Sequence, residues 1–171
     1  MGSGTPSKTR LNYQNERSLE SGGEQKVGRN NGEAASMIKA VIDTNVLVSA
    51  FWTPNRRSPT VRIADAITKD LFTPLYSPQI IVEYREVLSR SKFAFSEDEV
   101  HNLVDHIVTH GELVEPTDSA DHFPDPDDKV FFCTVLAASA DNPFLVTGNA
   151  KHYPPADFIV SPAEFCDILG I

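Results

Sequence analysis

Short apolar runs that alternate with helical patterns constrain this chain more than any other feature of its sequence. The runs are rich in β-branched and aromatic residues, as buried strands are, and they cover 39–42, 143–147 and 157–160. Between them, apolar residues recur at the three- and four-residue spacing of amphipathic helices. Helical crossovers make the strands they connect parallel and cover both faces of the sheet. The pattern therefore predicts an α/β fold with a mostly parallel central sheet.

Helix starts are marked by serine residues. A serine side chain can cap the free amides of a first turn, and proline loses no hydrogen bond at the first helical position. Ser-Pro pairs stand at 58–59, 77–78 and 161–162, each ahead of a helical pattern. Ser96 and Glu99 have the spacing of a capping box, which predicts a further helix that ends near Gly111. A short strand is predicted directly after it, at 112–116.

The first 36 residues differ in composition from the rest. Segment 1–36 is rich in Gly, Ser, Asn, Gln and charged residues and lacks apolar periodicity, which predicts a disordered extension ahead of a folded domain at 37–171. From Met37 onward the sequence holds 10 Lys and Arg against 20 Asp and Glu, and the whole chain has a formal net charge of -9. Net charge alone would therefore repel nucleic acid, although a local basic rim beside an acidic pocket is compatible with it.

The sequence also indicates where the protein works. No stretch approaches the roughly 18 apolar residues that a membrane-spanning helix needs, and 1–36 lacks the apolar stretch of a secretory signal. We therefore expect a cytoplasmic protein with no membrane partner. Cys133 and Cys166 fall in helical patterns, and we expect both to be buried free thiols. Cysteines and histidines do not occur at zinc-like spacing, so no thiolate site is predicted.

Acidic residues stand where the predicted sheet would gather distant segments. In parallel α/β sheets the ligand site lies outside the carboxyl ends of the strands, near the point where strand order reverses. Asp43 ends the first predicted strand, and the sequence TGN at 147–149 follows another. The cluster DPDD at 125–128 lies at a helix start, and Glu83 lies on the flank of a helix. We expect these elements to converge at one end of the sheet.

Converging carboxylates favour a particular chemistry. They repel one another, and burying them is costly unless protons or cations compensate their charge. Ligand sets made only of oxygen atoms suit Mg²⁺ or Mn²⁺. Such an ion can lower the pKa of a bound water and hold a phosphate oxygen, which is the logic of phosphodiester hydrolysis.

Each of these residues also has a purely structural interpretation. Asp43 is compatible with a turn or a helix cap, and Glu83 with a solvated helix face. One of Asp127 and Asp128 is expected to cap the helix that follows. Asn149, which follows a glycine, also suits the left-handed conformation of a turn.

The segments that carry these residues resemble the PIN-domain family, in the same order along the chain. The matching stretches are VIDTNVLVSAF, SPQIIVEYREVLSR, FPDPDDKVFFCTVLAASADNPFLVTGNAKHYP and FIVSPAEF. Within the family, the chain is similar to the toxin components of bacterial toxin-antitoxin systems. The resemblance implies a three-layer α/β/α fold and a Mg²⁺- or Mn²⁺-dependent ribonuclease.

The resemblance also implies roles for individual acids. Asp43, Glu83 and Asp128 correspond to the three metal-binding acids of the family, with Asp127 in place of Asp128 if the register shifts by one residue. Asn149 stands where many PIN domains have a fourth acid. Because an amide oxygen brings no charge, Asn149 should weaken the binding of a second ion more than that of the first.

Other polar residues surround the expected acidic centre. The resemblance implies that Asn45 supports the first acid and that Thr147 is the hydroxyl residue near the last. Lys151 and His152 are candidates for contact with a substrate phosphate, although His152 alone is more typical of a surface or turn residue. Candidates for a basic rim, each also compatible with an ordinary solvated surface, are Arg56, Arg57, Arg85, Arg90 and Lys92.

The leading hypothesis is a metal-dependent endoribonuclease that acts on RNA, with an antitoxin protein and a second copy of the chain as expected partners. The alternative is a degenerate PIN domain that binds RNA or protein without cutting. A phosphoaspartate enzyme is disfavoured because Asn45 stands where such phosphatases usually have a second acid. A receiver domain is disfavoured because no paired acids close the first strand. Dinucleotide binding is disfavoured because no G-x-G-x-x-G follows a strand.

Overall fold

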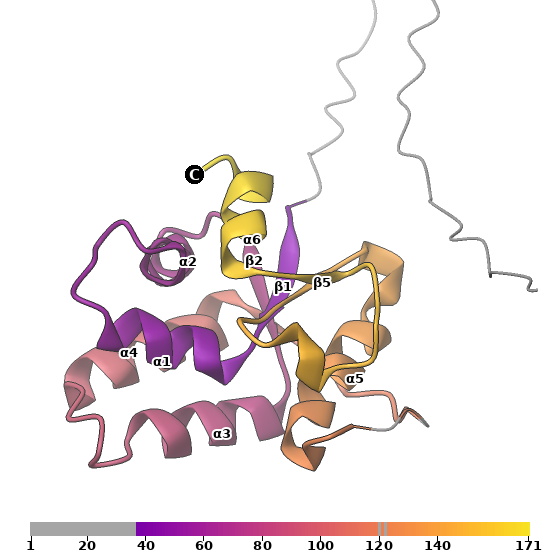
Figure 1. The fold of residues 1–171 in the computed structure, drawn as a ribbon, viewed down its shortest axis with the longest axis horizontal. Helices are drawn as coiled ribbons and strands as arrows, with labels where there is room; N and C mark the ends of the chain where they lie inside the picture. The colour runs from indigo at the N-terminus through magenta and orange to yellow at the C-terminus, as the bar shows by residue number, and fades with distance from the viewer. Residues whose placement is uncertain (1–36, 120, 122) are drawn as a thin grey trace, which may run out of the picture. The chain divides into compact units, whose positions relative to one another are not determined.

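Five strands form one parallel sheet in the order β3-β2-β1-β4-β5 (Figure 1). The computed structural model describes residues 37–119, 121 and 123–171, so the predicted disorder of 1–36 lies outside the described residues. The strands are β1 (Lys39–Ile42), β2 (Thr73–Tyr76), β3 (Glu112–Leu113), β4 (Phe144–Val146) and β5 (Ile159–Val160). All four strand pairs are parallel, which confirms the predicted α/β class.

In the part of the chain that the structure describes, six α-helices complete three layers. They are α1 (Thr44–Trp52), α2 (Pro59–Thr68), α3 (Pro78–Leu88), α4 (Glu97–His110), α5 (Lys129–Ala137) and α6 (Pro162–Leu169). Helices α1, α2 and α4 lie to one side of the sheet and α5 to the other (Figure 1). Helix α5 packs against β1, β2 and β4, while α2 contacts α1, α4 and α6. Within the described part of the chain, no helix is long and apolar enough to cross a membrane.

Three short 3₁₀ helices lie in the second half of the chain. They are η1 (Pro126–Asp128), η2 (Ser139–Asp141) and η3 (Ala150–His152). Helix η1 leads directly into α5, and η3 follows β4 after a short turn. Helix η1 therefore lies in the connection before α5, and η3 lies in the connection after β4.

Strand β1 occupies the centre of the sheet because its residues suit burial on both faces. Ala40, Val41 and Ile42 each have 1% or less of their surface exposed. Ala40 lies opposite Pro74 of β2 on one side and Phe144 of β4 on the other. Asp43, the next residue along the chain, is thereby placed at the middle of one edge of the sheet.

Strand β2 was not predicted, because proline cannot donate to a ladder and is rare within strands. The sheet accommodates Pro74 for a geometric reason. Thr73 donates its N–H to Ile38 O on the β1 side at 2.8 Å, so the nitrogen of Pro74 faces the opposite, β3 side. Pairing with β3 starts only at Leu75, opposite Glu112. The missing N–H of Pro74 therefore costs no hydrogen bond to a neighbouring strand.

Helix α1 was not predicted either. Its sequence TNVLVSAFW is rich in β-branched residues, which favour strands when propensity alone decides. Here the side chain of Asp43 accepts from the N–H of Asn45 and caps the first turn. Val46 and Leu47 are then buried in the core, with 1% and 0% of their surface exposed. Capping and tertiary packing thus outweigh the local preference.

The predicted serine caps are present to different degrees. The side chain of Ser77 accepts from Ile80 N at 3.3 Å, and Ser161 forms a full capping box with Glu164. Ser58 precedes α2 without a side-chain cap. The capping box predicted at Ser96 is only half formed: its hydroxyl accepts from Glu99 N at 3.4 Å, but no return bond from the Glu99 side chain is present.

A buried hydrogen bond attaches α3 to the end of β1. Tyr84 is 1% exposed and its hydroxyl donates to the carbonyl oxygen of Ile42. Burial, followed by the nearby charges of Asp43 and Glu83, raises the pKa of Tyr84 well above its ordinary value, so the hydroxyl stays protonated as a donor. This bond holds the part of α3 that carries Glu83 beside the carboxyl end of β1.

We predict that Tyr84→Phe lowers the free energy of unfolding by about 1–2 kcal/mol, because the carbonyl of Ile42 loses its buried donor. Urea unfolding of the purified variant measures the change. Tyr76→Phe is the matched control, since the Tyr76 hydroxyl donates to Val108 O in an exposed position. Equal losses in the two variants would contradict the anchoring role of Tyr84.

Candidate metal centre

Strand order reverses between β1 and β4, and the acidic residues collect at that point. The chain runs from β1 to β2 and β3 on one side, then returns to β4 on the other side of β1. The carboxyl ends of β1 and β4 therefore form the switch point at which parallel α/β sheets bind ligands. Asp43 follows β1 and Thr147 follows β4, and Asp43 N–H donates to Val146 O at 2.9 Å.

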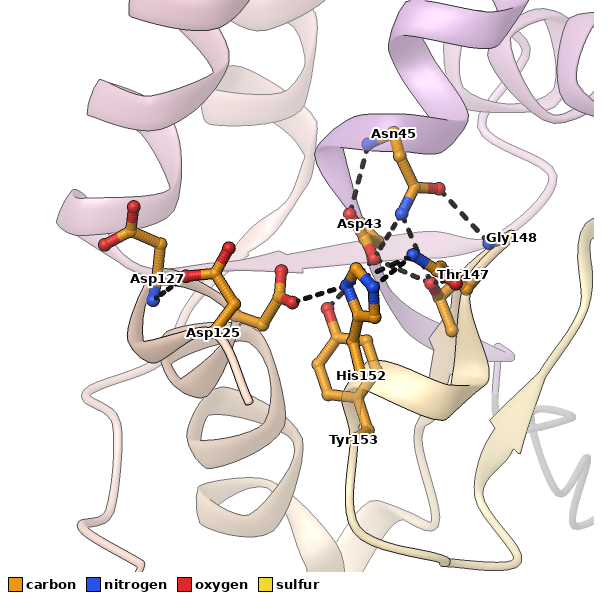
Figure 2. Close-up of polar contacts among 10 residues, drawn as sticks. Asp43, Asn45, Asp125, Asp127, Thr147, Gly148, His152 and Tyr153 are labelled. Carbon is orange, nitrogen blue, oxygen red and sulfur yellow. Dashed lines mark hydrogen bonds and ion pairs between the residues drawn. The ribbon is translucent and has the colours of Figure 1, made fainter. Parts of the chain in front are cut away.

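The carboxylate of Asp43 is held by donors from three segments of the chain (Figure 2). Its Oδ2 atom accepts from Asn45 Nδ2 at 2.7 Å, from the Thr147 hydroxyl at 2.7 Å and from the Tyr153 hydroxyl at 2.9 Å. Its Oδ1 atom accepts only from Asn45 N, at 3.1 Å. Asp43 is 4% exposed, so these bonds replace most of its contact with water. They also leave Oδ1 with capacity for a further partner.

Asn45 connects the start of α1 to the loop after β4. Besides its two bonds to Asp43, its side-chain oxygen accepts from Gly148 N at 3.2 Å. The Thr147 hydroxyl, which donates to Asp43, also accepts from Asn149 N at 3.0 Å. The TGN turn is thereby fixed against the first acid, as Figure 2 shows.

Glu83 reaches the same place from α3. The hydroxyl of Thr44, the first residue of α1, donates to Glu83 Oε1 at 2.6 Å. Burial raises the pKa of Glu83, the bond from Thr44 opposes that shift, and the charges of Asp43 and then Asp128 add to it. The half-buried Glu83 thus lies within the electrostatic influence of both other acids.

Asp128 completes the group from the start of α5. His152 Nδ1 donates to Asp128 Oδ2 at 3.0 Å. Burial raises the pKa of Asp128, the charge of Asp43 adds to this, and the hydrogen bond from His152 opposes it. Asp128 stands at the N-cap position of α5, as expected of Asp127 or Asp128, but its side chain makes no capping bond. The side-chain cap lies one short helix earlier, on η1, where Asp125 Oδ1 accepts from Asp127 N at 3.0 Å.

Asp127 and Asn149 have different surroundings from these three acids. Asp127 is exposed, its carboxylate points away from His152, and its charge is the smallest contribution to the raised pKa of Glu83. The Nδ2 atom of Asn149 lies 2.6 Å from His152 Nε2, so this amide contacts the histidine. Because His152 Nδ1 donates to Asp128, His152 Nε2 accepts the hydrogen bond from the amide of Asn149.

Among the described residues, no lysine or arginine forms an ion pair with Asp43, Glu83 or Asp128. The one basic side chain within reach is the imidazole of His152, whose Nδ1 lies 3.0 Å from Asp128 Oδ2. Of the predicted basic rim, Arg85 pairs with Asp105 at 3.3 Å, and Arg56 and Arg57 follow the far end of α1. The remaining two rim candidates, Arg90 and Lys92, likewise follow the far end of α3. Lys151 is exposed beside His152 and is the basic candidate next to the acids along the chain.

Two site residues were missed or undervalued in the sequence. Tyr153 is 5% exposed and donates to Asp43, but a tyrosine ahead of two prolines gives no sign of that contact. Burial raises the pKa of Tyr153 far above its ordinary value, so it remains a donor. His152 was expected to be a surface or turn residue, yet it bonds to Asp128. One sign of this contact was present in the sequence: His152 lies only four residues after the TG dipeptide that follows β4, and so close to the predicted site.

The donor set fits a hard divalent cation. Asp43, Glu83 and Asp128 lie within electrostatic range of one another, and each has one oxygen held by hydroxyl, amide or imidazole donors and another with fewer or no bonds in the described structure. Burial is the main cause of the raised pKa values of Glu83 and Asp128, and the charge of Asp43 adds to both, so a cation beside these acids would relieve the cost of their negative charge. Oxygen ligands and excess negative charge are what Mg²⁺ and Mn²⁺ require.

Fold and site together define a three-layer α/β/α protein with an acidic centre at the switch point of a parallel sheet. A family model described as PIN domain matches residues 39–151, and the chain belongs to the PIN-domain family. PIN domains are generally metal-dependent nucleases, so membership indicates a nuclease-type function. Comparison with curated proteins and with solved structures gives no match.

We predict that Glu83→Gln stabilises the metal-free protein at neutral pH. A carboxyl group whose pKa is raised in the folded state contributes to the stability of the protein while it is protonated. This contribution is lost as pH rises from the ordinary pKa through the raised pKa. Glutamine keeps the acceptor for Thr44 and removes the charge. The gain should therefore be present at neutral pH and disappear as pH falls below the ordinary pKa of glutamate.

Urea unfolding across pH, with a chelator present, measures this difference. Glu86→Gln is the matched control, because Glu86 is exposed on the same helix. The prediction is contradicted if Glu83→Gln is less stable than the wild type at neutral pH. It is also contradicted if the difference in unfolding free energy between the two proteins is the same at every pH, because the folded state would then not raise the pKa of Glu83.

Proposed function

We propose that this protein is an endoribonuclease that hydrolyses RNA phosphodiester bonds with Mg²⁺ or Mn²⁺ held by Asp43, Glu83 and Asp128. The observation that carries the proposal is that Asp43 just before α1, Glu83 on α3 and Asp128 just before α5 influence one another electrostatically at the carboxyl edge of the sheet. Family membership supports nuclease chemistry, and the choice of RNA rests on the sequence resemblance described above. When bound, such an ion would lower the pKa of a coordinated water and neutralise phosphate charge.

The surrounding residues would keep the acids in place for that role. Asn45, Thr147 and Tyr153 fix the orientation of the Asp43 carboxylate through Oδ2, which leaves Oδ1 toward the site. Thr44 does the same for Glu83 through Oε1. Because these donors come from packed elements, the acids would need little rearrangement on binding.

His152 and Lys151 would serve the substrate side of the centre. His152 is partly exposed and holds a proton on Nδ1 against Asp128, and Lys151 is exposed next to it. The ammonium group of Lys151 would offset the repulsion between RNA phosphates and the acids. In an acidic domain, productive RNA contact would thus depend on this local charge.

The toxin-like resemblance extends the proposal to partners. We expect an antitoxin protein whose segment occupies the acidic centre, and a homodimer of this chain. Analytical ultracentrifugation of the purified chain and co-purification from the native host would test these two expectations separately from catalysis.

We predict that Asp43→Asn reduces cleavage of single-stranded RNA about a hundredfold or more, since one metal-binding oxygen loses its charge. Asparagine can still cap α1 through its oxygen, but its amide nitrogen cannot accept the three bonds that reach Oδ2, so circular dichroism is used to check that the variant is folded. The assay follows a labelled RNA in Mg²⁺ or Mn²⁺, and chelation by EDTA should abolish the activity.

Asp167→Asn is the matched control because Asp167 is exposed on α6, the last helix. The control should cleave as the wild type does. Cleavage that survives Asp43→Asn, or that persists in EDTA, would exclude this centre as the source of activity.

A binding module without catalysis is the second candidate, and Asn149 is the observation that favours it. Asn149 is neutral at a position where many PIN domains have an acid. Its amide nitrogen contacts His152. A module would bind RNA or protein with the same surface but would not cut. Saturable RNA binding without cleavage under any divalent cation would favour it.

We predict that Asn149→Asp strengthens Mn²⁺ binding by on the order of tenfold, because it adds a negative charge next to the three acids. Isothermal titration of the full chain measures both affinity and the number of ions. Asn102→Asp, on the exposed surface of α4, is the matched control. Unchanged or weaker binding in Asn149→Asp would mean that residue 149 does not face the ion.

A further inference from the structure

A second group of metal-ligating side chains lies outside the acidic centre. Asp70, His106 and His110 each present a ligand atom, and these three atoms lie within 4.8 Å of one another. His106 Nε2 is 2.9 Å from Asp70 Oδ1. The rings of His106 and His110 stack with centroids 4.1 Å apart. Two imidazoles and one carboxylate thus point to one small volume.

The group lies at the other end of the sheet from the acidic centre of Asp43, Glu83 and Asp128. Asp70 follows α2 and precedes β2, and the two histidines stand in the last turns of α4, just before β3. In parallel strands these positions border the amino ends, whereas Asp43 follows the carboxyl end of β1. The two groups therefore cannot share one ion.

The backbone directs Asp70 toward α4. Asp70 has φ 52°, a left-handed conformation that aspartate tolerates better than most residues. Its N–H donates to Ile67 O at 3.1 Å, and Leu71 N–H donates to Ala66 O at 3.0 Å, which ends α2 in a tight turn. The carboxylate then reaches His106 on the neighbouring helix.

The histidines are arranged as metal ligands require. They are four residues apart on α4, so both rings lie on one face of the helix. His110 Nδ1 lies 3.3 Å from His106 O and donates to it, which leaves the lone pair of Nε2 free. His106 can move its proton from Nε2 to Nδ1 and then present Nε2 while staying neutral.

We propose that Asp70, His106 and His110 form a second cation site, selective for a late first-row divalent ion such as Zn²⁺. Imidazole suits Zn²⁺ and its neighbours in the series, whereas Mg²⁺ prefers oxygen ligands. Four-coordinate Zn²⁺ with bonds of about 2.0–2.1 Å places its ligand atoms roughly 3.3 Å apart. Here His106 Nε2 and Asp70 Oδ1 are 2.9 Å apart and all three ligand atoms lie within 4.8 Å, so small side-chain shifts would fit them to such an ion. Asp70 and His110 are exposed, so water can fill the fourth position.

Such an ion would connect the end of α2 to the end of α4. Helices α2 and α4 already pack against each other, and the polar contact between their ends is the pair of Asp70 and His106, whose side chains are 53% and 20% exposed. Exposed ion pairs of this kind contribute little to stability. A bound cation would instead stabilise the folded state in proportion to its affinity and concentration. The site is structural in this proposal and independent of nuclease chemistry.

The test is isothermal titration of the full chain with Zn²⁺ in excess Mg²⁺, so that the acidic centre is occupied. We expect one Zn²⁺ per chain and a higher melting temperature on binding. The double variant His106→Gln/His110→Gln loses both imidazole ligands, so its affinity for Zn²⁺ should fall about tenfold or more. The rise in melting temperature on adding Zn²⁺ should disappear. Cys133 and Cys166 are buried and burial raises the pKa of both thiols, so they should not compete.

His101→Gln is the matched control, because His101 is also an exposed histidine of α4 but pairs with Asp105. It should bind Zn²⁺ as the wild type does. Absence of saturable Zn²⁺ binding by the wild type overturns the proposal. So does equal affinity in the double variant, or a loss of the Zn²⁺ signal in Asp43→Asn, which would place the ion at the acidic centre instead.

Discussion

The buried carboxylate of Asp43 is the constraint on which the rest of the site depends. A carboxylate removed from water needs hydrogen bonds or opposite charge, and Asp43 obtains four hydrogen bonds from Asn45, Thr147 and Tyr153. These bonds join the start of α1, the turn after β4 and the segment after η3. The polar network therefore determines both where the first acid points and how the later loop folds over the carboxyl edge of the sheet.

The same sheet gathers two chemically different groups at its two ends. Helices α1, α3 and α5 all carry their acids to the carboxyl edge, because each helix follows a strand in a parallel crossover. The result is an oxygen-rich centre with raised pKa values for Glu83 and Asp128. At the amino edge, the ends of α2 and α4 bring two imidazoles to one carboxylate. If both proposals hold, ligand type would separate a hard cation from a borderline one within one domain.

The sequence predicted the fold class well and the details of the site unevenly. Apolar runs and serine caps located most helices and four of the five strands among the described residues, and the strand-end rule predicted Asp43, Glu83 and Asp128 in one region. Strand β2 was missed because the tolerance of Pro74 depends on where β3 begins, which is a tertiary property. Tyr153 was missed because its donor role arises from a loop that folds back over β1. The spacing of cysteines and histidines gave no sign that Asp70 lies beside His106 and His110, because Asp70 is 36 residues earlier than His106 and meets it only in the fold.

The most direct test of the central claim is a crystal of the full chain grown with Mn²⁺ and measured for anomalous scattering. The account predicts a strong anomalous peak bounded by Asp43 Oδ1 and by carboxylate oxygens of Glu83 and Asp128, at the short distances typical of oxygen ligands. Diffraction at saturating Mn²⁺ that shows these three carboxylates together with no peak between them would contradict it.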